Sequence, residues 1–126
     1  NVGYVVMAQS AAITQSTTAA ASGIIIPAHS QILEATVFVT TAYDNSATLS
    51  IGTSSSSNEL ATAVAVSTIN QIKLASQATI TDADNWLDVG ATDVKIFTDS
   101  SATTSDVGRA TLTVTYVQQI SPGLTA

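Results

Sequence analysis

The segment "ATLTVTYV" (110–117) constrains the fold more than any other part of the sequence, because it alternates apolar and hydroxyl side chains. Ala, Leu, Val and Tyr occupy one set of alternate positions, and three threonines and a valine occupy the other. Successive side chains of a β-strand point to opposite faces, so this pattern predicts a strand with one face on a core and one in solvent. The rest of the chain must then supply a second layer to cover the apolar face.

The same two-residue period recurs along the chain, with β-branched residues throughout. It predicts strands at 33–40, 48–51, 94–98 and 110–117, with further strand signals at 2–7, 23–26, 64–67, 72–74, 79–81 and 86–89. Turn residues separate these runs at 27–30, 43–46, 52–58, 82–85, 90–91 and 99–108. The one helical candidate is "NELATAVA" (58–65), where Asn58 can cap a short helical turn. Many short strands with frequent turns predict an all-β protein, an antiparallel sandwich or barrel.

The length of 126 residues fits one domain with a sizeable core. The segment "AQSAAITQSTTAAAS" (8–22) is small and polar, and it is too weakly apolar to build a core of its own. We therefore predict an extended N-terminal arm at 1–22, which can add a short strand. The sandwich domain is predicted at 23–120 and a C-terminal tail at 121–126.

Charge and composition exclude several classes of partner. Charged residues make up 10% of the chain, and the net charge is −6 with three cationic side chains, Lys73, Lys95 and Arg109. Binding to nucleic acid or to an anionic membrane needs clustered cations, so neither is expected. No apolar run is long enough for a transmembrane helix. The 16 serines and 20 threonines give a hydroxyl-rich surface that can meet another protein without desolvating many ions, which favours assembly.

The sequence offers little for catalysis. His29 is the single histidine, and its neighbour Ser30 would point to the opposite face of a strand. No Gly-x-Ser-x-Gly elbow or phosphate-binding loop is present, and the chain has no cysteine. We interpret His29 as a turn residue next to Pro27 and predict that the protein is not an enzyme and needs no cofactor.

The acidic segment "TDADNWLD" (81–88) contains the best candidates for a metal site. Asp82, Asp84 and Asp88 supply the oxygen ligands that Ca²⁺ prefers. The EF-hand pattern fails, because Leu87 stands where glycine belongs and no glutamate closes the loop. We therefore expect a solvated acidic turn and predict no metal site.

Four motifs follow one another along the chain: "IIIPAHSQILEATVFVTTAYD" (24–44), "ATLSIGTS" (47–54), "NELATAVAV" (58–66) and "GRATLTVTYV" (108–117). In this order they resemble the small β-sandwich decoration (cement) proteins on the capsids of tailed bacteriophages. The resemblance spans about residues 23–118, with His29 at a position where glycine is expected in that family.

The resemblance implies an all-β fold, an antiparallel β-sandwich of jelly-roll-like type. It also implies a structural virion protein on the outer surface of a capsid, where homotrimers stabilise the shell by binding between subunits of the major capsid protein. The residues that we expect at such an interface are Val2, Tyr4, Val6, Ile13, Trp86 and Arg109. The alternative is a carbohydrate- or receptor-binding domain of a phage fibre or adhesin. That alternative needs an exposed aromatic platform or a Ca²⁺ site, with Trp86, Tyr43 and the acidic loop at 82–88 as candidates.

Overall fold

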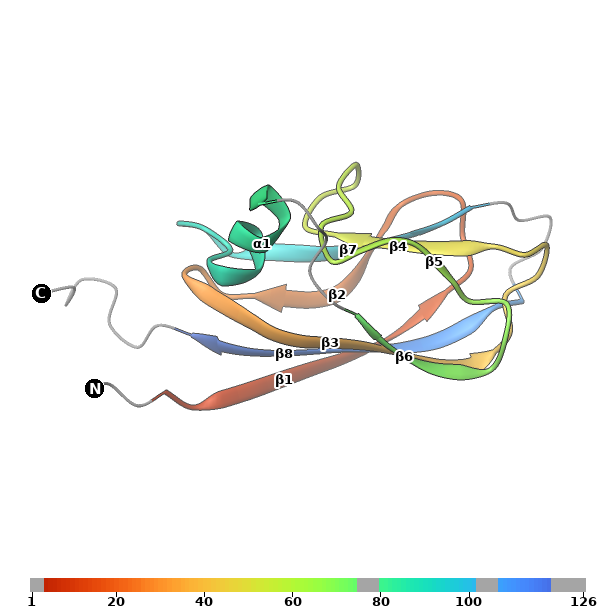
Figure 1. Ribbon diagram of the computed structural model, residues 1–126, viewed down its shortest axis with the longest axis horizontal. Coiled ribbons are helices and arrows are strands. Elements are labelled where there is room, and N and C mark those ends of the chain that lie inside the picture. Colours follow the sequence, from red (N-terminus) through yellow and green to blue (C-terminus); the bar gives the residue numbers. More distant parts are fainter. Residues whose placement is uncertain (1–3, 75–79, 102–106, 119–126) are drawn as a thin grey trace, which may run out of the picture.

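Eight strands and one short helix form the structure, a computed structural model that describes residues 4–74, 80–101 and 107–118 (Figure 1). The elements are β1 (Val6–Thr14), β2 (Ala20–Ile26), β3 (Ser30–Thr41), β4 (Thr48–Gly52), β5 (Ala61–Ala65), β6 (Asn70–Leu74), α1 (Ile80–Leu87), β7 (Val94–Ser100) and β8 (Arg109–Gln118). The strands predicted at 33–40, 48–51, 94–98 and 110–117 are confirmed, and those at 23–26 and 72–74 lie within β2 and β6. Of the signals at 2–7 and 64–67, only residues 6–7 and 64–65 are strand, in β1 and β5, and residues 2–3 lie outside the described part.

Two four-stranded antiparallel sheets pack face to face (Figure 1). The order is β1-β8-β3-β6 in the first sheet, which we call sheet A, and β2-β7-β4-β5 in the second, sheet B. The first strand pairs with the last, the second with the seventh, the third with the sixth and the fourth with the fifth. This is the pattern of a long antiparallel hairpin wound into two layers, the jelly roll. The predicted all-β jelly-roll sandwich is confirmed.

The core lies between the two sheets and follows the alternation read in the sequence. In β8, Leu112 and Val114 are fully buried, while Thr111 is exposed and Thr113 half-buried on the other face. The inward positions of β3 and of sheet B contribute the rest of the layer. Among them, Ala35, Val37, Val39, Ile26, Ile51 and Ile96 have no exposed surface.

The segment predicted as an N-terminal arm is part of the sandwich from Val6 onward. β1 pairs with β8 along its whole length, from Val6 opposite Val117 to Thr14 opposite Arg109. Ile13 points inward and is 3% exposed. The composition of this segment is weakly apolar, but an inward Ile and a complete ladder of backbone hydrogen bonds to β8 are sufficient to hold an edge strand. The prediction for residues 1–22 allowed a short strand, and in the structure this segment contains the nine residues of β1 and the start of β2.

The helical turn predicted at 58–65 is wrong, and the helix of the structure lies at Ile80–Leu87. Residues 61–65 of the expected helical turn form β5, which pairs with β4. The turn predicted at 82–85 and the first half of the strand predicted at 86–89 are instead part of α1. Of the strand signal at 79–81, residues 80–81 also belong to α1, and residue 79 lies outside the described residues. Ala83 and Trp86 are three positions apart and therefore lie on the same side of α1. The Trp86 ring is 8% exposed and packs on the core. No helix within the described ranges is long and apolar enough to cross a membrane.

A buried corner holds the two sheets together at the end opposite α1. The side chain of Gln15, 1% exposed, accepts hydrogen bonds from the backbone N–H of Asp44 and of Gly108, both at 3.2 Å, and its amide donates to the Asp44 carboxylate at 2.6 Å. Tyr43 packs its ring directly on Gly108. Burial raises the pKa of Tyr43 to about 12, while the Arg109 guanidinium acts in the opposite direction.

Candidate assembly surface

The outer face of sheet A is rich in threonine and alanine. Register places Ser10, Thr113 and Thr36 in one row across β1, β8 and β3, and Ala12, Thr111 and Phe38 in another. The Ser10 and Thr113 hydroxyls hydrogen-bond at 2.7 Å. The Lys73 ammonium and the Glu34 carboxylate lie 3.7 Å apart near the β6 edge. This face carries few ions, so covering it costs little desolvation of charge.

Exposed apolar side chains gather where β1 begins and β8 ends. Val6 is opposite Val117 in the ladder, and Leu33 projects outward at a bulge in β3 near the same row. Tyr4, Val6 and Leu33 are 45%, 58% and 45% exposed. Leu87 at the end of α1 is 62% exposed and lines one cavity together with Tyr4 and Val117. We call this set, Tyr4, Val6, Leu33, Leu87 and Val117, the apolar end.

A groove of about 320 Å³ opens within the apolar end. Its apolar lining comes from Tyr4, Leu87 and Val117. The polar groups at its rim are His29, Gln31 and Asp88. The elements that supply it are far apart in sequence but meet at one end of the sandwich, where β8 ends, β3 begins and α1 lies (Figure 1). A concave apolar surface with a polar rim is the usual form of a site that receives a side chain from a partner.

The rim of the groove is held by the β2–β3 turn and the end of α1. His29 adopts a left-handed backbone conformation with φ of 58°, and its N–H donates to the Gly90 carbonyl at 2.8 Å. The N–H of Val89 donates to the Ser30 carbonyl at 3.0 Å, and His29 Nδ1 lies 3.7 Å from the Asp88 carboxylate. His29 is therefore a turn residue, as predicted, at a position whose φ favours glycine.

The predicted interface residues lie in different parts of the structure. Tyr4 and Val6 lie in the apolar end, whereas Ile13 and Trp86 are buried inside the sandwich. Arg109 is exposed at the opposite end of β8, where its guanidinium donates to the Gly108 carbonyl at 2.8 Å. Val2 lies outside the described residues. Sequence reasoning missed Leu33 and Leu87, because a strand pattern gives no sign of a bulge and residues 86–89 were predicted to be a strand.

The three acidic candidates do not converge. Asp82 and Asp84 lie two residues apart on α1 and therefore on different sides of the helix, and Asp88 faces His29. Among the described residues, no group of three or more His, Cys, Asp or Glu side chains could hold a metal ion. The arrangement offers no multidentate oxygen site of the kind that Ca²⁺ requires.

The aromatic platform considered for sugar binding is not present at the residues that were expected to form it. Tyr43 is 2% exposed, and Trp86 donates its indole N–H to the Glu59 carbonyl at 2.8 Å inside the molecule. Both rings stabilise the sandwich. They leave no face for a saccharide to stack on.

Glu59 is a buried carboxylate that orders the loop between β4 and β5. It is 5% exposed and accepts hydrogen bonds from the hydroxyl and the backbone N–H of Thr53, the latter at 2.9 Å. Burial alone would favour the neutral acid, but these hydrogen bonds outweigh it and lower the pKa of Glu59 below its ordinary value of 4.5. The carboxylate is therefore ionised in the folded protein and fixes the start of the loop.

We expect Glu59→Gln to remove part of the acid sensitivity of folding. A lowered pKa adds stability that is complete above the pKa of the unfolded chain, and that stability is lost as the pH falls below about 4.5 through the folded-state pKa. At pH 7 the variant should lose about 1–3 kcal/mol, the usual worth of a hydrogen bond to a charged group. Urea unfolding at pH 7 and pH 3 measures both. An equal loss for wild type and variant between the two pH values would contradict the role given to Glu59.

Sequence comparisons with protein families and with curated proteins found no match. Comparison with solved structures found the same fold in capsid structures of three phages. A chain of the "Cyanophage Pam1 capsid asymmetric unit" aligns with a TM-score of 0.66 at 16% identity, over 94% of this chain and 89% of that chain. A chain of the "Capsid of Ralstonia phage GP4" aligns with 0.68 at 17%, over 91% and 85%. A chain of the "Acidic stable capsid structure of Helicobacter pylori bacteriophage KHP30" aligns with 0.65 at 13%, over 92% and 90%.

Proposed function

We propose that this protein is a structural component of a bacteriophage capsid, which decorates the outer surface and stabilises the shell by binding between subunits of the major capsid protein. The observation that carries this proposal is the shared jelly-roll fold with chains of three phage capsid structures. At 13–17% identity the likeness extends to the fold alone. The role is therefore argued from the surface of this chain as well.

The size of the matched chains supports an accessory role. Each alignment covers 85–90% of the matched chain and more than 90% of this one, so the matched chains are of similar length. The length of 126 residues given for this chain is that of one sandwich domain. Such a domain is better suited to bind on top of a lattice that another protein forms.

The surface chemistry supports binding to protein. The apolar end presents Tyr4, Val6, Leu33 and Leu87 at 45% exposure or more, a density of large apolar side chains that usually marks an interaction site. The adjoining outer face of sheet A is covered by small and hydroxyl side chains. Binding energy toward the assembled lattice then adds directly to the stability of the shell.

A carbohydrate-binding role receives less support from the same observations. Jelly rolls also occur in lectins, so the fold permits it. The rings of Tyr43 and Trp86 are buried, and the carboxylates at 82–88 do not form a Ca²⁺ site. The residues on which this alternative depended therefore do not support it.

We expect the purified protein to be a trimer that binds shells of the phage that encodes it. Light scattering should give three times the chain mass of 12.8 kDa. Co-sedimentation with shells assembled from the major capsid protein should show saturable binding, and electron cryomicroscopy should place the added density outside, between capsid subunits. A strict monomer with no affinity for shells would refute the proposal, and a response on a glycan array would favour the carbohydrate-binding alternative.

A further inference from the structure

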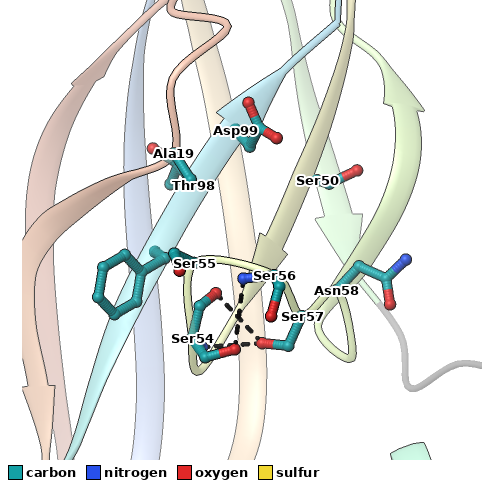
Figure 2. A pocket seen from close by; sticks show the side chains of 10 residues that line it. Ala19, Ser50, Ser54, Ser55, Ser56, Ser57, Asn58, Thr98 and Asp99 are labelled. Atoms are coloured by element: carbon teal, nitrogen blue, oxygen red, sulfur yellow. Dashed lines mark hydrogen bonds between the residues drawn. The ribbon is translucent and has the colours of Figure 1, made fainter.

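A small polar pocket lies on the outer face of sheet B, remote in sequence from the apolar end. The loop of four serines, Ser54–Ser57, folds back over β4 and β7 (Figure 2). Gly52 makes this possible, because a Cβ at that position would lie 2.3 Å from the Ser57 carbonyl oxygen. The Ser57 hydroxyl accepts a hydrogen bond from the Ser54 N–H at 2.8 Å, so the loop is internally tied. The cavity beneath it measures about 160 Å³.

One oxygen of the Asp99 carboxylate is left without a partner at this pocket. Asp99 projects outward from β7 opposite Ser50 of β4, and both line the cavity. Its Oδ1 is inaccessible to solvent and makes no hydrogen bond within the described structure. An unsatisfied buried carboxylate oxygen is costly, so the negative charge of Asp99 is poorly compensated within the protein and favours a cation in the adjoining pocket.

The remaining lining fits a cation. No Lys, Arg or His lines the pocket, and its polar groups are Ser, Thr and Asn side chains that can accept hydrogen bonds. Phe97 adds an aromatic ring, whose face attracts cations. A single carboxylate makes a poor metal site, because Ca²⁺ and Mg²⁺ take six or more oxygen ligands. An ammonium group has three donors and no acceptor, which suits this set of acceptors.

We propose that the pocket formed by Asp99, Phe97 and the Ser54–Ser57 loop receives a cationic side chain, a Lys ammonium or an Arg guanidinium, from a neighbouring capsid subunit. The volume, about five times the ~30 Å³ that one water takes in the liquid, holds such a head group and the methylenes next to it. The identity of the neighbour rests on the proposed function. The affinity of the pocket for an organic cation does not, so the two can fail separately.

The first test uses n-butylammonium chloride as a probe of the isolated protein, followed by amide chemical shifts in NMR. Wild type should show saturable shifts at Ser50, at Ser54–Ser57 and at Asp99, with a dissociation constant in the millimolar range. Asp99→Asn should weaken binding about tenfold or more, because it removes a charge-assisted hydrogen bond. Asp84→Asn removes an exposed charge on α1 and serves as the matched control, with unchanged binding.

Sodium chloride at equal ionic strength and n-butanol should give no saturable shifts at these amides. Absence of saturation in wild type, or equal affinity in the Asp99→Asn and Asp84→Asn variants, would overturn the pocket assignment.

The second test measures binding of the same variants to shells. Asp99→Asn should bind shells about tenfold more weakly than Asp84→Asn, and the difference should shrink at high salt. Equal shell binding together with normal butylammonium binding by wild type would overturn the capsid subunit as the source of the cation. Failure of wild type to bind shells would instead count against the proposed function, since the butylammonium result is independent of shells.

Discussion

The double variant Leu33→Lys/Leu87→Lys should lose shell binding by more than 100-fold while remaining folded. Both side chains are exposed in the apolar end, at 45% and 62%, so the free energy of unfolding should change by only about 0.5 kcal/mol. Lys at position 87 also suits the last turn of α1, because cations interact favourably with a helix C-terminus. In the complex, however, two ammonium groups would be buried without partners, at several kcal/mol each.

Co-sedimentation with shells and thermal unfolding of the free protein measure the two quantities. Ile69→Lys provides the matched control, because Ile69 is 64% exposed and precedes β6 at the opposite end of the sandwich. This variant should bind as wild type does. Equal loss in both variants would show that added positive charge, and not the apolar end, determines binding. Full binding by the double variant would refute the role of the apolar end.

Gly108→Ala should destabilise the fold more than any single change at the surface. An added Cβ would lie 2.4 Å from Cδ1 of the Tyr43 ring, and both residues are buried. The ring has little room to retreat because it is 2% exposed. Any shift of the backbone instead strains the hydrogen bonds that Gln15 makes to Gly108, at 3.0 and 3.2 Å. Overpacking of this kind costs about 3 kcal/mol, which corresponds to a fall in melting temperature of about 10 °C.

A double-mutant cycle with Tyr43→Ala identifies the cause. Once the ring is removed, Gly108→Ala should cost less than about 1 kcal/mol, because the Cβ then has space. Calorimetry or urea unfolding of the four proteins gives the coupling free energy. A cost for Gly108→Ala that is the same with and without the ring would locate the strain elsewhere.

The sequence predicted the fold class well because strand alternation is a local property. The pattern at 110–117 required one buried and one exposed face, and β8 has both. The predicted turn at His29 is also correct, since Pro27 and a residue in the left-handed conformation end β2 by local constraints. The short strands left a sandwich or a barrel open, the resemblance implied the jelly-roll type, and the strand order is that of a jelly-roll sandwich.

Local patterns were insufficient where long-range contacts outweigh local preference. Residues 8–14 lack the apolar content of a typical strand, yet β8 supplies a complete pairing edge for them. Residues 80–87 contain turn-forming Asp and Asn, yet they form a helix that buries Trp86 on the core. Residues 61–65 can form a helical turn, yet pairing with β4 makes them a strand. In each case the partner lies far away or beyond a loop, where a local pattern gives no information.

The amino-acid sequence by itself determined the all-β class, the absence of a basic surface and the hydroxyl-rich faces, because these depend on composition and on a period of two. Only the tertiary structure decided which residues share a surface. One groove is lined by Tyr4, Leu87 and Val117 because β8 ends near the start of β1 and the end of α1. Asp99 lines one pocket together with a serine loop some 40 residues away because β7 pairs with β4. Side chains on separate strands come together through backbone pairing, and the register of that pairing is fixed only when the two sheets close on a common core.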